Sequence, residues 1–139
     1  MERRQALPLP IARVIVIAVY ATSLVVYPAI GATVKLQTVL APHTGQLLGI
    51  ILLSLGAVEY GLSLWLEQRL LARAAAQGNP QAAVTAAIVV AAIGETMAIF
   101  GLALALLGVN AWALALYALC LLHGIHLALR WPDYEQAVP

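Results

Sequence analysis

The chain has 139 residues, of which 63% are hydrophobic and 9% are charged, and its formal net charge at pH 7 is +1. A mean hydropathy of +0.95 excludes a water-soluble globular protein, because too few polar residues are present to cover its surface. The scattered charges form no basic patch, so the sequence also argues against nucleic acid as a partner. An integral membrane protein is therefore predicted.

Four apolar stretches are as long as the roughly 20 residues that a helix needs to cross a bilayer. They cover residues 11–30, 45–66, 82–107 and 111–129. We therefore expect an all-α polytopic membrane protein, built as one domain of four antiparallel transmembrane helices.

The first stretch follows Met1-Glu2-Arg3-Arg4 and resembles a secretory signal, but its length of about 20 residues favours a retained membrane anchor. The long connection 31–44 is expected to lie along the outer interface. The distribution of basic residues predicts that both termini are cytoplasmic. One side would hold Arg3, Arg4, Arg13, Arg69, Arg73 and Arg130, and the other side only Lys35.

Turn-forming residues separate the later stretches. Gln77-Gly78-Asn79-Pro80 should end the second helix and start the third. The short link Gly108-Val109-Asn110 makes the last two helices neighbours. Trp131-Pro132 is expected to end the fourth helix at the membrane interface, and Tyr27 is expected to be an interfacial anchor.

Small residues repeat along the third stretch at alternating spacings of four and three, which is typical of a helix-packing seam. The seam consists of Ala87, Ala91, Gly94, Ala98, Gly101, Ala105 and Gly108. Helices in lipid associate through close backbone contact, so another helix is expected to lie against this seam.

Two glutamates, Glu59 and Glu95, interrupt the second and third stretches at equal distances from residue 77. A charge at membrane depth costs at least about 2.5 kcal/mol, so such residues indicate a functional site. Two close carboxylates cannot both remain ionised, and the pair should hold a proton or a cation between them. Tyr60 and Thr96 would add hydroxyl ligands. The residues leave the choice between H⁺ and Na⁺ open, and both glutamates could instead be neutral and only join helices.

The segment Ala91–Leu107, with Gly94-Glu95-Thr96 near its start, resembles the carboxylate-bearing helix of subunit c, the proteolipid of rotary ATP synthases. The polar loop that ends in Pro80 is similar to that family's loop. The resemblance covers about Gly45–Gly108 and implies that Glu95 carries the ion, with Glu59 and Thr96 as co-ligands. The whole chain also resembles small four-helix bacterial membrane proteins that share a Glu-x-x-Ala-Ile-x-Gly-Leu helix. This likeness implies a place in a bacterial inner membrane but no function.

The fourth stretch carries a polar stripe of Cys120, His123, His126 and Arg130 toward its predicted cytoplasmic end. Haem is disfavoured because His43, the only other histidine, is predicted on the opposite side of the membrane. A metal site would need more ligands than the stripe offers. The histidines are expected to donate to backbone or to Glu67 and at most to relay protons.

No nucleophile–base pair, phosphate-binding loop or zinc motif is present, so we expect no enzyme activity and no cofactor beyond the bound H⁺ or Na⁺. The first functional hypothesis is a small subunit that binds and passes H⁺ or Na⁺ within a larger membrane complex. The alternative is an accessory subunit that packs against larger partners without chemistry of its own. Membrane lipids, other subunits or further copies of the chain are the expected partners.

Overall fold

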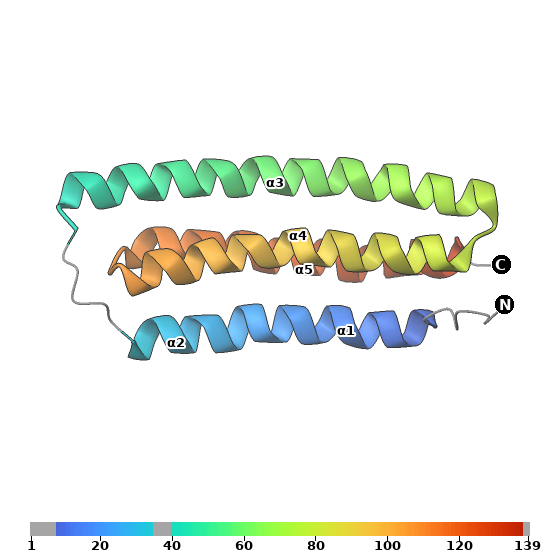
Figure 1. The fold of residues 1–139 in the computed structure, drawn as a ribbon, viewed down its shortest axis with the longest axis horizontal. Coiled ribbons are helices and arrows are strands. Elements are labelled where there is room, and N and C mark those ends of the chain that lie inside the picture. The colour runs from blue at the N-terminus through green and yellow to red at the C-terminus, as the bar shows by residue number, and fades with distance from the viewer. Residues whose placement is uncertain (1–7, 35–39, 138–139) are drawn as a thin grey trace, which may run out of the picture.

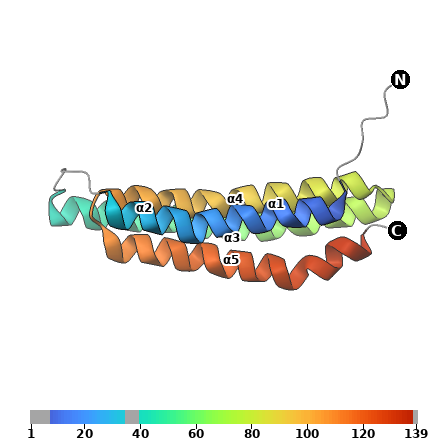
Figure 2. The same ribbon diagram turned by 90° about the horizontal axis from the view of Figure 1, so that it is seen from below.

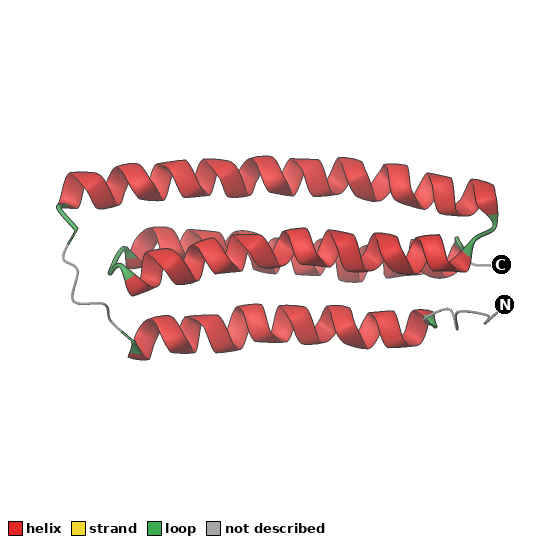
Figure 3. Ribbon diagram, viewed as in Figure 1, coloured by secondary structure: helices red, strands yellow, loops and turns green. Residues whose placement is uncertain are grey.

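The computed structural model describes residues 8–34 and 40–137 of the chain. Its elements are α1 (Leu9–Ala21), the π-helical segment η1 (Thr22–Val26), α2 (Tyr27–Thr33), α3 (Pro42–Gln77), α4 (Pro80–Leu106) and α5 (Asn110–Gln136). α1, η1 and α2 join into one span, so the described residues form four long helical spans (Figures 1 and 3). The expected all-α class is confirmed.

All four spans are long and apolar enough to cross a membrane. Large apolar side chains such as Val14, Val58 and Leu129 are largely exposed on the outside of the bundle. Water would make such a surface costly, whereas lipid tails make it favourable. These features support a multi-pass membrane protein.

Two helices are longer than the sequence predicted. The second was expected over 45–66 but continues to Gln77, and the fourth was expected over 111–129 but continues to Gln136. The prediction that Trp131-Pro132 ends the last helix is wrong, because Pro132 lies inside α5. A proline within a helix removes only the one backbone hydrogen bond that its N–H would donate to the carbonyl four residues earlier. The Arg130–Asp133 ion pair and the Tyr134–Glu67 hydrogen bond stabilise the last turns of α5.

The α3–α4 connection forms as its residues predict. Gly78 ends α3 in a left-handed conformation with φ of 55°, which glycine adopts without strain. Asn79 then caps α4, because its Oδ1 accepts a hydrogen bond from the Gln81 amide at 3.0 Å. Pro80 is the first residue of α4, where its missing N–H has no cost. Arg3, Arg4, Lys35 and residues 35–39 of the predicted outer connection lie outside the described residues.

α4 and α5 lie between α3 on one side and the α1–α2 span on the other (Figures 1 and 2). α4 packs along α1, α2, α3 and α5, and is therefore the central helix of the bundle. Its buried positions are mostly alanine, valine and glycine, which allows four helices to approach one another closely.

The small-residue seam of α4 faces the inside of the bundle. Six of its seven members are buried, namely Ala87, Ala91, Gly94, Ala98, Gly101 and Ala105. Gly108 lies beyond the end of α4, in the exposed turn before α5, with φ of 78°. Tyr117 of α5 packs against Gly101, and Gly31 of α2 packs against Ala105. The seam therefore binds α2 and α5 of the same chain.

Replacing Gly101 by alanine should destabilise the bundle. The added Cβ would lie 2.9 Å from Cε1 of Tyr117, and overpacking of this kind costs about 1–3 kcal/mol. Gly61→Ala is the matched control, because nothing lies within 4 Å of a Cβ at Gly61. Unfolding titrations in mixed detergent micelles would measure the free energy of unfolding of both variants. Equal values would contradict the close contact between Gly101 and Tyr117.

Candidate functional site

A fully buried histidine lies at the middle of the bundle. His123 is equally far from both ends of α5, and its side chain is 0% exposed. Glu59 lies at the midpoint of α3, and Tyr20 lies close to the middle of the first span. The fourth stretch was expected to end at residue 129, with His123 toward its end, but α5 continues to Gln136 and His123 lies at its middle.

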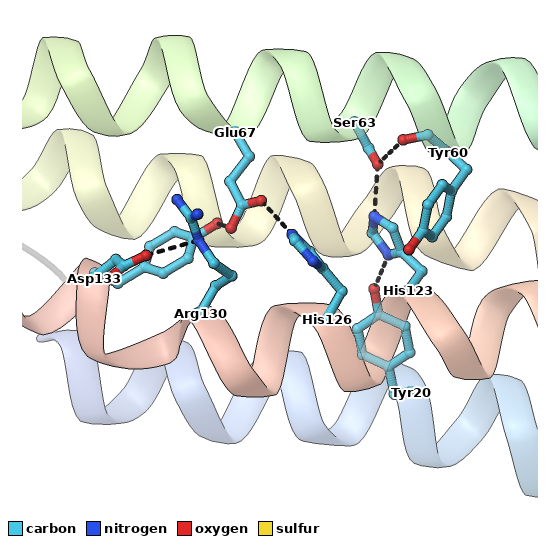
Figure 4. Close-up of polar contacts among 9 residues, drawn as sticks. Tyr20, Tyr60, Ser63, Glu67, His123, His126, Arg130 and Asp133 are labelled. Atoms are coloured by element: carbon cyan, nitrogen blue, oxygen red, sulfur yellow. Dashed lines mark hydrogen bonds and ion pairs between the residues drawn. The ribbon is translucent and has the colours of Figure 1, made fainter.

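Both ring nitrogens of His123 are hydrogen-bonded to side chains from other helices (Figure 4). Nδ1 is bonded to the Tyr20 hydroxyl of α1, and Nε2 lies 2.7 Å from Oγ of Ser63 on α3. Ser63 is 0% exposed. Three helices thus meet at one imidazole ring, which satisfies polar groups that lipid could not solvate.

The number of available protons assigns the tautomer of His123. Ser63 donates its only hydroxyl proton to the backbone carbonyl of Tyr60 at 2.7 Å, so Ser63 can only accept from Nε2. Nε2 therefore carries a proton, and in the neutral ring Nδ1 accepts from Tyr20. The geometry fits a neutral imidazole with a donor on one side and an acceptor on the other.

Two glycines give the Tyr20 side chain room to reach His123. A Cβ at Gly94 of α4 would clash with both the Tyr20 hydroxyl and the His123 ring. A Cβ at Gly124 of α5 would lie 2.9 Å from Cδ1 of Tyr20. Gly94, predicted as a packing residue, is thus also required for the polar contact.

A second polar contact between α3 and α5 lies one turn nearer the Gln77 end of α3. Glu67 is 1% exposed. It accepts a hydrogen bond from the Tyr134 hydroxyl at 3.0 Å and is hydrogen-bonded to Nε2 of His126 at 2.9 Å. The side chain of His126 is 30% exposed. The contact between a histidine and Glu67 that the sequence suggested is therefore present. Nε of Arg130 lies 2.7 Å from Oδ2 of Asp133, and this ion pair lies beside Glu67 (Figure 4).

Glu95 makes its hydrogen bond with the first span. The Tyr27 hydroxyl of α2 donates to Oε1 of Glu95 at 2.8 Å, so Tyr27 is a partner of the carboxylate and more than an interfacial anchor. Thr96 donates to the carbonyl of Ala92 on its own helix at 3.3 Å. Thr96 therefore retains only its lone pairs for a ligand.

Glu59 is half-buried, and its Oε2 is buried without a hydrogen-bond partner among the described residues. Tyr60 packs the edge of its ring against His123, with ring centroids 5.4 Å apart. No described hydrogen bond or ion pair joins Glu59 to Glu95. Glu59 lies near the middle of α3 and Glu95 near the middle of α4, and their pairing stays a prediction.

Sequence reasoning did not identify Tyr20, Ser63 or Tyr134 as site residues. The sequence gives only weak signals for two of them. Ser63 fits the small-residue spacing of α3, and Tyr20 is a tyrosine within an apolar stretch. Within residues 8–34 and 40–137, no group of three His, Cys, Asp or Glu side chains is placed to hold a metal ion.

Removing the Tyr20 hydroxyl should weaken the bundle more than removing that of Tyr60. Tyr20→Phe leaves Nδ1 of His123 buried without a donor, which should cost about 1–2 kcal/mol. Tyr60→Phe keeps the ring contact with the same histidine and is the control. Unfolding titrations would compare the two variants, and a larger loss for Tyr60→Phe would contradict the described bonding.

No family model, curated protein or solved structure matches this chain. The fold shows a small four-helix membrane protein, and its function has to be argued from the site.

Proposed function

We propose that the protein binds a proton at the mid-bundle glutamates Glu59 and Glu95 and passes it within the membrane. The observation that carries this proposal is the polar layer at the middle of the bundle. In that layer His123 is bonded on both ring nitrogens and Glu95 accepts from Tyr27. Titratable groups at membrane depth are costly to keep, and proton carriers are a frequent reason for their presence.

A proton suits the described ligands better than Na⁺ does. A hard cation needs oxygen ligands on several sides. The hydroxyls beside Glu95 are those of Tyr27 and Thr96, and Thr96 is already bonded to Ala92. A proton needs only one free carboxylate oxygen, and the buried Oε2 of Glu59 has no described partner.

The resemblance of Ala91–Leu107 to the rotary proteolipid supports the same assignment. By that resemblance Glu95 is the carrier, and Glu59 and Thr96 are co-ligands. We propose that this protein, like the proteolipid, is a non-catalytic subunit of a larger membrane complex or of a homo-oligomer.

We further propose that both termini face the cytoplasm of a bacterium, with the protein in the inner membrane. The start of α1 and the ends of α3 and α5 lie at one end of the bundle (Figure 1). Arg13 of α1 lies over the Trp131 ring of α5 at 5.8 Å from its centroid, and Arg69, Arg73 and Arg130 belong to the same end. Basic residues concentrate on the cytoplasmic side of membrane proteins.

The alternative of a purely structural subunit has less support than the sequence suggested. It relied on small-residue seams that would receive helices of larger partners. In the structure Gly94 and Gly101 are covered by Tyr20 and Tyr117 of the same chain. The outward faces of the bundle are left for lipid and for any partner subunit.

Glu95→Gln should abolish labelling of the protein by a hydrophobic carbodiimide, which reacts with protonated carboxyl groups in the membrane. Glu59→Gln should reduce the labelling rate without abolishing it, because it changes the neighbouring ion site. Glu135→Gln, which alters an exposed glutamate near Arg13, should label as the unchanged protein does. Mass spectrometry of the labelled protein would locate the adduct.

The same labelling distinguishes the two ions. Protection by Na⁺ at constant pH would favour a sodium site. Labelling that persists in Glu95→Gln would remove Glu95 from the proposal.

A further inference from the structure

The two polar contacts between α3 and α5 form a ladder along the bundle axis. Ser63 and Glu67 are four residues apart on α3, and His123 and His126 are three apart on α5, so each pair shares one helix face. The rungs are Ser63–His123 at 2.7 Å and Glu67–His126 at 2.9 Å. Glu59 lies one further turn along the same face of α3.

Burial along the ladder decreases in one direction. Ser63 and His123 are 0% exposed and Glu67 is 1% exposed, whereas the His126 side chain is 30% exposed. Beyond Glu67, a groove of about 410 Å³ between α3 and α5 is lined in part by Gln68, Arg130 and Asp133. The ladder therefore runs from the middle of the bundle toward the end at which this groove lies.

The groups that face Glu67 are suited to proton exchange. Tyr134 of α5 donates to its carboxylate, Nε2 of His126 is hydrogen-bonded to the other carboxylate oxygen, and Arg130 lies nearby (Figure 4). The buried residues in the first half of α4 are alanine and valine only, namely Ala83, Val84, Ala86, Ala87, Val90 and Ala91. Among the described residues, both hydrogen-bond partners of the Glu67 carboxylate therefore belong to α5.

From this ladder we infer a proton path between His123 and the groove at the Arg130 end, by way of Ser63, Glu67 and His126. The path rests on the proposed function, since it connects the mid-bundle glutamates to one side of the membrane. Its ligand is the proton itself.

Each step conserves protons. When Tyr20 gives its hydroxyl proton to Nδ1 of His123 and takes a proton from a mid-bundle carboxyl group in its place, the Nε2–H bond breaks and that proton moves to Ser63, leaving the imidazole neutral. Ser63 rotates and releases its own proton toward Glu67, about one helical turn or 5.4 Å along the axis, a span that needs one water molecule as a bridge. Glu67 then forms an O–H bond. With His126 in the tautomer that carries its proton on Nδ1, Nε2 takes the Glu67 proton while the Nδ1–H bond breaks and releases a proton toward the groove, so that Glu67 is ionised and the imidazole neutral again. Reversed steps bring a proton inward.

Hydrogen–deuterium exchange of the Glu95 carboxyl group tests this path. The protein is reconstituted in phosphatidylcholine–phosphatidylglycerol bilayers, and the carbonyl band of the protonated carboxyl is followed by infrared spectroscopy after transfer to D₂O. The band is assigned by its loss in Glu95→Gln. Glu67→Gln and His123→Gln should slow its exchange at least about tenfold, because an amide does not accept and release protons as a carboxylate or imidazole does.

Matched substitutions outside the ladder serve as controls. Glu135→Gln and His43→Gln make the same chemical changes at exposed positions and should leave the exchange rate unchanged. His126→Gln is a second ladder variant at a partly exposed site, where misfolding is less of a risk, and it should also slow exchange. Circular dichroism would verify the helix content of every variant.

The outcomes separate the two proposals. A band that exchanges at the unaltered rate in Glu67→Gln, His123→Gln and His126→Gln overturns the path and leaves Glu95 as a proton carrier. The absence of any protonated-carboxyl band lost in Glu95→Gln overturns the proposed function, and the path with it. Exchange that is slowed in the three ladder variants but not in the two controls supports both the proton site and the proton path.

Discussion

The bonding of His123 is the interaction on which the centre of this bundle depends. A buried imidazole has two polar nitrogens, and lipid offers neither of them a partner. Tyr20 and Ser63 supply both partners from two other helices. The contact therefore specifies how α1 and α3 are rotated about α5, because any other rotation would bury an unpaired nitrogen.

Close packing and polar contact depend on each other in this structure. Tyr20 reaches His123 only because Gly94 and Gly124 leave room for its ring, and Tyr117 packs on Gly101 in the same way. The glycines of α4 thus serve two purposes. They allow van der Waals contact between helices, and they admit tyrosine side chains that carry a hydroxyl into the interior.

The polar groups are distributed unevenly along the bundle axis. From His123 toward the Gln77 end of α3 three separate contacts follow one another, namely Ser63–His123, Glu67–His126 and Arg130–Asp133. Toward the other end lie the Tyr27–Glu95 hydrogen bond and Oη of Tyr117, which is buried without a partner among the described residues, and no further described contact leads from them to that end. This asymmetry is the physical basis for inferring that exchange with the mid-bundle carboxylates takes place from one side.

The sequence by itself determined the membrane class, the four spans and the turn at Gly78-Asn79, because hydropathy and backbone preferences are local properties. It also singled out Glu59 and Glu95, since charge is conspicuous in an apolar stretch. Only the tertiary structure decided that Tyr27 is the partner of Glu95 and that His123 lies at the middle of the bundle. Those facts depend on where α5 ends and on how four helices are rotated against one another, and both are set by contacts between residues far apart in the chain.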